Sequence, residues 1–178
     1  MTQTVPVWQA MVALLGTIIL ALIGHIIAVA KLKTDIRQKN FENSMRVVET
    51  HDAAYRTYTA ALKAYGENPE PKYEDFMKIV SAGDIYFHQY SLICNSMLSG
   101  LVDVNIRDNT WIPKIRVVLE KTLPYHYQTL KNASEKGGFP YTGELRRCDH
   151  ESIYAAAEMF STSSAWLRSH EELGAPNT

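Results

Sequence analysis

Residues 7–30 read VWQAMVALLGTIILALIGHIIAVA and contain no formally charged side chain. As an α-helix this segment extends roughly 36 Å, which is enough to cross a hydrocarbon core of about 30 Å. A cleaved signal peptide is the alternative, but it requires a basic segment before the apolar one, and residues 1–6 (MTQTVP) contain no Lys or Arg. The segment is therefore predicted to be a membrane-spanning helix.

Basic residues follow this helix directly, at Lys31, Lys33, Arg37 and Lys39, and none precedes it. Because basic flanks stay on the cytoplasmic side, the sequence predicts a single-pass protein of the inner (plasma) membrane with its N-terminus outside. The same side chains can contact anionic headgroups, so the lipid bilayer is one expected partner. The expected parts are an extracytoplasmic tail (residues 1–6), a transmembrane helix (7–30) and a cytosolic domain (31–178).

Small side chains form a stripe along one side of the predicted transmembrane helix. In lipid, helices associate where small residues allow close approach, so the stripe predicts self-association into a homo-oligomer. His25 lies beside the stripe and either faces the interior of such a bundle or a pore, or sits neutral near the headgroups. The predicted interface comprises Ala10, Ala13, Thr17, Ala21, Gly24, His25 and Ala28.

The remainder of the chain is predicted to be all-α, because apolar residues recur at helical spacing and no useful strand-like alternation occurs. No Gly or Pro lies between Gly24 and Gly66, so the first cytosolic helix is expected to continue from the transmembrane helix. Pro124 is expected to kink or break its helix. Helices are predicted over 33–65, 72–99, 110–131 and 144–172, with a connector at 67–71 and a loop at 132–143.

Composition excludes several classes of function. The net charge of −1 argues against a long nucleic-acid ligand, and two cysteines cannot supply a disulfide scaffold or a CxxC-type zinc site. No nucleophile elbow, phosphate-binding loop or metalloprotease motif occurs, so we expect no enzyme, no metal and no cofactor. Asp84 and His88 share a helical face, but two ligands do not make a metal site.

A glycine-rich stretch near residue 140 is the most suggestive cytosolic feature. Glycines let a ligand approach the backbone, helix N-termini attract phosphates, and a tyrosine can stack on a base. Two arginines expected in the first helical turn oppose the helix dipole, which indicates a bound anion or a nearby carboxylate. The alternative is a solvated loop with ordinary surface arginines. The predicted ligand-binding residues are Lys136, Tyr141, Arg146 and Arg147, together with Lys114 and Arg116 on the third helix.

The chain resembles, in its layout, the small single-span membrane effectors of prokaryotic antiphage defence, in particular those of type III CRISPR systems. The resemblance rests on the segment 7–30, the basic KLKTDIRQK that follows it, and the helical remainder. It implies a homo-oligomer, such as a tetramer, that binds a cyclic oligoadenylate and perturbs the membrane.

Together these features favour an oligomeric single-pass effector whose cytosolic domain binds a small anionic ligand of the cyclic-nucleotide second-messenger class. One alternative is a non-enzymatic bitopic scaffold or accessory subunit that binds a protein partner. The other is a membrane-tethered enzyme with an unrecognised site.

Overall fold

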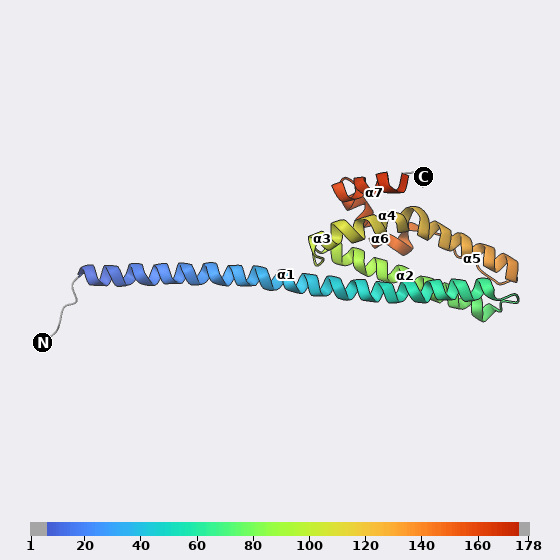
Figure 1. The fold of residues 1–178 in the computed structure, drawn as a ribbon, viewed down its shortest axis with the longest axis horizontal. Helices are drawn as coiled ribbons and strands as arrows, with labels where there is room; N and C mark the ends of the chain where they lie inside the picture. The colour runs from blue at the N-terminus through green and yellow to red at the C-terminus, as the bar shows by residue number, and fades with distance from the viewer. Residues whose placement is uncertain (1–6, 175–178) are drawn as a thin grey trace. The chain divides into compact units, whose positions relative to one another are not determined.

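The computed structural model describes residues 7–174, and these are helical without any strand, which confirms the predicted all-α fold. The predicted tail over residues 1–6 lies outside the described residues. The chain divides into two compact units, with the boundary between Asn40 and Phe41. Helix α1 (Val7–Glu67) contributes residues to both units, and the other helices belong to the second (Figure 1).

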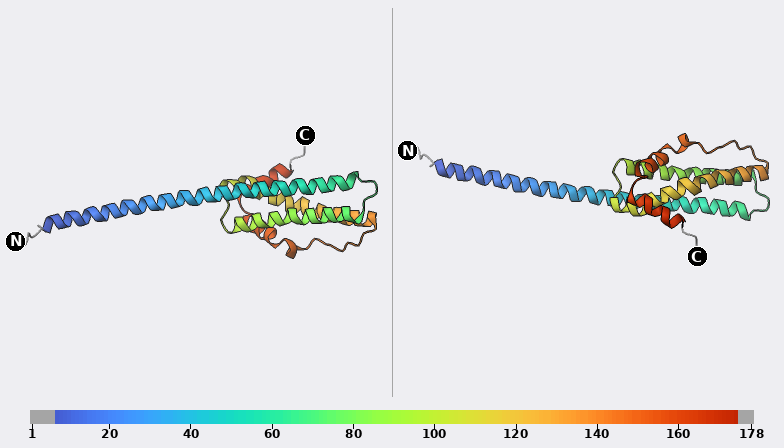
Figure 2. Two further views of the ribbon diagram at one scale, coloured as in Figure 1. Left: turned by 90° about the horizontal axis from the view of Figure 1, so that it is seen from below. Right: turned by 90° about the horizontal axis from the view of Figure 1, so that it is seen from above.

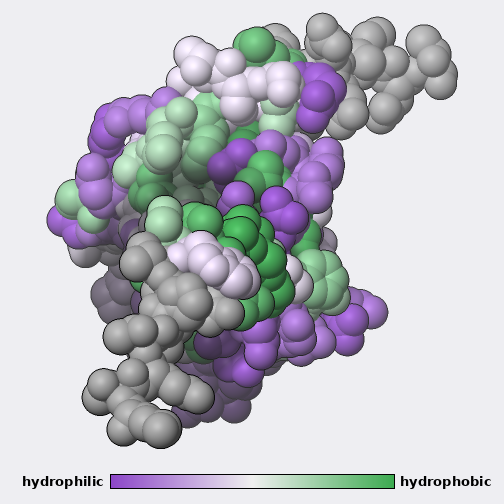
Figure 3. Space-filling model, turned by 90° about the vertical axis from the view of Figure 1, so that its left-hand side faces the viewer, coloured by the Kyte–Doolittle hydropathy of each residue, from purple (hydrophilic) through white to green (hydrophobic). Residues whose placement is uncertain are grey.

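The first unit carries the one helix among the described residues that is long and apolar enough to cross a membrane. Its large apolar side chains are exposed, with Leu20 at 70% and Ile26 at 66%. Figure 3 views α1 end on and shows hydrophobic side chains gathered around it. The structure thus confirms one continuous helix that is long and apolar enough to span a membrane, while the span itself, its orientation and the identity of the membrane stay predictions.

Helix α1 ends two residues later than predicted, because Gly66 is helical and the helix runs to Glu67. A short connector then leads to α2 (Tyr73–Leu98). Within it the Asn68 side chain accepts a hydrogen bond from the Glu70 amide at 3.0 Å and donates to the Asp75 carboxylate at 3.1 Å. Gly100, with a φ of +69°, ends α2 in the left-handed conformation that glycine favours.

The region from 104 to 137 forms one helical run that contains two π-helical turns. Helix α3 (Val104–Ile106) is capped by Asp103, whose carboxylate accepts hydrogen bonds from the amides of the first turn. The π-turns Arg107–Trp111 and Val118–Thr122 precede α4 (Ile112–Val117) and α5 (Leu123–Gly137). Of the predicted kink or break at Pro124, the break does not occur: a π-turn widens the helix just before each proline, and the run continues through it.

The predicted loop over 132–143 and helix over 144–172 are both wrong in their bounds. Helix α5 continues to Gly137 and ends where Gly138 adopts a φ of +66°. An extended segment follows, then a 3₁₀ turn (Arg147–His150), α6 (Glu151–Phe160) and α7 (Ser164–Gly174). The last two helices are separate because Ser163 ends the turn between them and its hydroxyl accepts the Trp166 amide at 3.2 Å.

The core of the second unit lies between α2, α4, α5 and α6, against residues 41–67 of α1. Figures 1 and 2 show α2, α5 and this part of α1 running side by side. Helix α2 packs on both α5 and α6, and α4 packs on α6 and α7. The largest fully buried apolar side chains are Trp111, Phe76, Ile79, Ile93, Ile112, Ile115, Leu123, Leu130 and Ile153.

Helix α1 meets this core through apolar residues such as Ala54 and Leu62, and through polar residues repeated every seven positions: Ser44, His51, Tyr58 and Tyr65. Such spacing keeps one face of a helix against its neighbours. The Ser44 hydroxyl accepts the Asp103 amide at 3.1 Å, and the hydroxyls of Tyr58 and Tyr65 bond to groups on α5. Polar contacts therefore line the seam between α1 and the rest of the unit.

Candidate functional site

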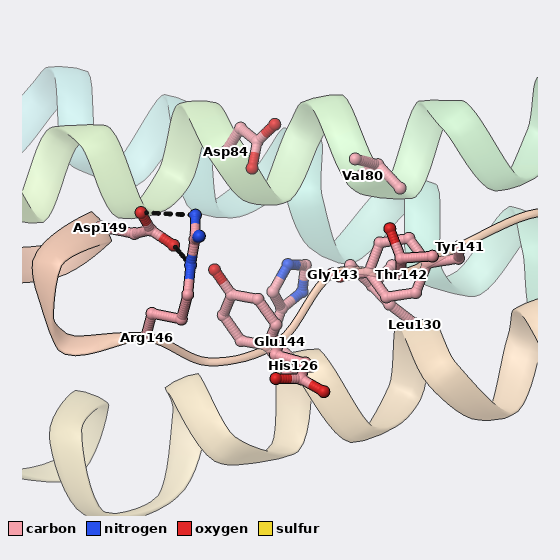
Figure 4. Close-up of a pocket in the computed structure, with 11 residues that line it drawn as sticks. Val80, Asp84, His126, Leu130, Tyr141, Thr142, Gly143, Glu144, Arg146 and Asp149 are labelled. Carbon is pink, nitrogen blue, oxygen red and sulfur yellow. Dashed lines mark hydrogen bonds and ion pairs between the residues drawn. The ribbon is translucent and has the colours of Figure 1, made fainter.

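Two cavities in the second unit are lined by three of the six predicted ligand-binding residues, Tyr141, Arg146 and Lys114. The first, called here the polar cavity, lies between α2, α5 and the segment that follows α5, and has a volume of about 410 Å³ (Figure 4). Its lining comprises Val80, Asp84, His126, Tyr127, Leu130, Tyr141, Thr142, Gly143, Glu144, Arg146 and Asp149.

His126 forms the inner wall of the polar cavity and is 2% exposed. Its Nδ1 lies 2.8 Å from the Tyr58 hydroxyl of α1, and its ring packs directly on Gly83 of α2. Burial lowers the pKa of His126 to about 4. The ring is therefore neutral at physiological pH and links three helices.

The extended segment is held in place by aromatic contacts. The rings of Phe139 and Tyr141 both pack on Phe76 of α2, with centroids 5.5 and 5.6 Å away. Gly143 lies directly beneath the Tyr141 ring, where no side chain fits. Tyr141 does line the cavity, but the ring that we predicted to stack on a base already contacts Phe76.

Both arginines of the predicted helix start are paired with carboxylates. Arg146 makes two hydrogen bonds to Asp149, at 2.9 and 3.1 Å, and this bonding holds the pKa of Asp149 below its usual range. Arg147 donates to Glu158 at 2.6 Å. Arg146 precedes the 3₁₀ turn in an extended conformation rather than lying in a helical turn. The sequence predicts either a bound anion or a nearby carboxylate beside these two arginines. The structure places a carboxylate beside each of them.

The polar cavity carries more acidic than basic groups. Asp84, Glu144 and Asp149 line it, against Arg146 alone. Burial raises the pKa of Asp84, whose carboxylate makes no hydrogen bond in the described residues. The cavity therefore presents acceptors, which disfavours an anionic ligand.

The remaining predicted basic residues lie elsewhere. Lys136 is in the last turn of α5 and does not line the polar cavity. Arg116 is 6% exposed, donates to Glu120 at 2.8 Å and to the Trp166 carbonyl at 3.0 Å, and lies over the Trp166 ring. These contacts attach α7 to α4. Arg116 is thus engaged within the protein, and Lys114 and Arg146 line different cavities.

Lys114 lines the second cavity, called here the aromatic cavity, which has a volume of about 550 Å³. Its walls come from α1, α2 and the α4 region, all within residues 41–174. Sequence reasoning missed this site because its rings are spread over separate helices and carry no local motif. Its lining comprises His51, Asp52, Tyr55, Tyr86, Tyr90, Pro113, Lys114, Val117, Val118 and Thr122.

The predicted self-association stripe remains a prediction. Thr17, Ala21, Gly24, His25 and Ala28 are exposed on α1, and a methyl group added at Gly24 would meet no atom within 4 Å. The Thr17 hydroxyl donates to the Leu14 carbonyl at 2.7 Å. The side chains of Ala10 and Ala13 lie outside those that the structure describes.

Comparison with known proteins adds no family: no family model, curated protein or solved structure matches this chain. Within the described residues no group of three or more His, Cys, Asp or Glu side chains is placed to hold a metal ion. The candidate site thus rests on the geometry of the two cavities.

Proposed function

We propose that this chain is an oligomeric single-pass membrane effector whose cytosolic helical domain binds a small anionic ligand and thereby acts on the membrane through its span. One observation carries the proposal. Helix α1 contains both the apolar segment and three residues of the aromatic cavity wall, His51, Asp52 and Tyr55. A ligand in that cavity therefore contacts the same helix that is proposed to cross the bilayer.

The aromatic cavity fits an anionic ligand better than the polar cavity does. Lys114 is half-buried at its edge, whereas the single arginine of the polar cavity is paired with Asp149. Cyclic nucleotides combine planar bases with negative charge, so this ligand class remains part of the proposal.

The test uses the full chain in vesicles of phosphatidylethanolamine and phosphatidylglycerol that contain a self-quenched dye. A panel of cyclic nucleotides and other aromatic anions is added, and dye release is expected with at least one of them. Arg37→Pro removes a hydrogen bond inside α1, between the apolar segment and the second unit, and is expected to abolish release while binding persists.

Arg37→Ala is the matched control, since it removes the same charge without breaking the helix. If the panel binds but neither the wild-type chain nor this control releases dye, the effector function is wrong. Release that survives in Arg37→Pro would contradict transmission through α1.

A second candidate function, a scaffold that binds a protein partner, is favoured by one surface. A groove between α1 and α2 is lined largely by apolar atoms and includes Met77 and Ile85, which are 39% and 51% exposed. Exposed apolar surface of this kind marks interaction sites. Failure of the whole ligand panel to bind would favour this function over the effector.

A further inference from the structure

The aromatic cavity is built from rings on two helices. His51 and Tyr55 come from α1, and Tyr86 and Tyr90 come from α2. The His51 ring lies 5.6 Å from Tyr86 and 4.9 Å from Tyr90, and Tyr55 lies 5.8 Å from Tyr86. Pocket volumes of about 300–1,000 Å³ are typical of small-molecule sites, so about 550 Å³ suffices for a ligand of one or two rings.

Polar groups beside these rings lack partners. His51 is 4% exposed, and its Nδ1 lies 3.1 Å from the Asp52 carboxylate, but its Nε2 is shielded from solvent and has no partner in the described residues. The same holds for Nε1 of the neighbouring Trp111. The hydroxyls of Tyr86 and Tyr90 share one long hydrogen bond, at 3.4 Å. Both nitrogens, of His51 and of Trp111, are closed to solvent, so the surface that the cavity offers to a ligand consists of ring faces and the Lys114 side chain rather than of these nitrogens.

His51 also marks a gap in the polar seam of α1. Ser44, Tyr58 and Tyr65 each bond to a group outside α1. Among the described residues, His51 forms a hydrogen bond only to Asp52, its neighbour on the same helix. Within that part of the chain, the seam position without a hydrogen bond outside α1 is thus the one that lines the cavity.

Charge selects the kind of ligand. The Lys114 ammonium lies 5.0 Å from the centre of the Trp111 ring and forms no ion pair in the described residues. Arg116, Arg146 and Arg147 are all paired with carboxylates. Asp52, the acidic residue of the same lining, has its carboxylate 3.1 Å from Nδ1 of His51, so Lys114 is the charged group of the cavity left to pair with a ligand, which favours an anionic group.

We propose that the aromatic cavity binds a small planar aromatic ligand that carries a negative charge, with its ring against the tyrosines and its anionic group at Lys114. This inference rests on the proposed function, because it names the ligand class of the same site. Its test measures binding without any membrane readout, so the two proposals can fail separately. A nucleotide and an aromatic carboxylate share this chemistry.

Calorimetric titration of the full chain in detergent micelles tests the inference with two matched pairs of probes. Adenosine 5′-monophosphate is compared with adenosine, and indole-3-acetate with the cation tryptamine. At least one anion is expected to bind about tenfold or more tightly than its partner probe. If only one of the two anions binds, the ligand class is the one that this anion represents, a nucleotide or an aromatic carboxylate.

Lys114→Met keeps the aliphatic stem, removes the charge, and is expected to weaken binding of the anion about tenfold or more. Lys121→Met is the matched control, because Lys121 is exposed and lies outside the cavity. Tyr55→Ala removes a half-exposed ring of the cavity wall and is expected to weaken the binding of adenosine and of its monophosphate to the same extent. Circular dichroism establishes that each variant is folded.

The proposal is overturned if neither anion binds at millimolar concentration, if tryptamine binds more tightly than indole-3-acetate, or if Lys114→Met binds like the wild type. Anion binding without dye release from vesicles would support this site and contradict the effector function. Ligand-induced dye release that is unaffected by Lys114→Met would support the effector function and contradict this site.

Discussion

Gly83 is the position where one added methyl group should disturb the link between three helices. A Cβ atom there would overlap Cε1 of His126 and lie 2.7 Å from its Nε2. The ring cannot move far, because its Nδ1 is bonded to Tyr58 and the residue is 2% exposed. Gly83→Ala must therefore shift α2 or displace His126 from Tyr58.

The magnitude follows from three contributions. Overpacking a buried contact costs about 1–3 kcal/mol, and loss of the Tyr58–His126 hydrogen bond costs about 1 kcal/mol. Alanine in a helix regains about 1 kcal/mol relative to glycine. Gly83→Ala is therefore expected to lower the free energy of unfolding by about 2 kcal/mol.

Urea unfolding of the full chain in detergent micelles, followed by tryptophan fluorescence, measures this change. Gly66→Ala is the matched control, because that helical glycine has no atom within 4 Å of an added Cβ and should become more stable. In a His126→Ala background the overlap is absent, so Gly83→Ala should no longer destabilise. A Gly83→Ala chain as stable as the wild type would refute the contact on which the reasoning depends.

Two further changes test the packing of the second unit. Because burial lowers the pKa of His126 from 6.5 to about 4, the unfolded chain binds a proton that the folded chain does not between these values. The contribution of neutral His126 to the free energy of unfolding is fully present above pH 6.5 and falls by about 3 kcal/mol as the pH drops to about 4. In His126→Gln the free energy of unfolding should therefore depend less on pH over this range. Arg116→Ala removes the bond to the Trp166 carbonyl, so amide hydrogen exchange in α7 should accelerate, whereas Lys121→Ala should leave it unchanged.

Much of the helical architecture was predictable because it depends on local signals. The apolar run, the basic flank and the lack of Gly or Pro before Gly66 predict one long α1. Asp103 marks a helix start through its own side chain. The path through Pro124 was not predictable in the same way, because a proline that ends a helix and one that follows a π-turn look alike in sequence.

Partners that lie far apart in the chain limited the prediction of the site. Tyr141 and Arg146 were identified from one local stretch, and the structure places both on the polar cavity. The carboxylates that pair Arg146 and Arg147 were not assigned in advance. Tyr58 and His126 are separated by 68 positions, so no local pattern indicates their hydrogen bond.

The face of α1 shows the same limit. Hydrophobic periodicity points to Phe41, Met45 and Tyr55, which are at least 42% exposed, but also to Tyr58, which is buried. The buried face also carries Ser44 and His51, which a hydrophobic pattern does not count. A polar seam is visible only once the partners on other helices are placed.

The composition of that seam bears on how α1 could respond to a ligand. Aliphatic seams attach helices strongly, whereas polar residues at such positions fix register at a cost in stability. Tyr58 and Tyr65 fix α1 against α5, and Ser44 fixes it beside α3. His51, between them, forms no hydrogen bond to another helix in the described residues, and a ligand seated against Tyr55 of α1 and Tyr86 of α2 would strengthen the attachment of α1 without changing its register. In the proposed function, binding would thus act by holding α1 more firmly, and ligand should slow amide exchange around His51 more than around Tyr65.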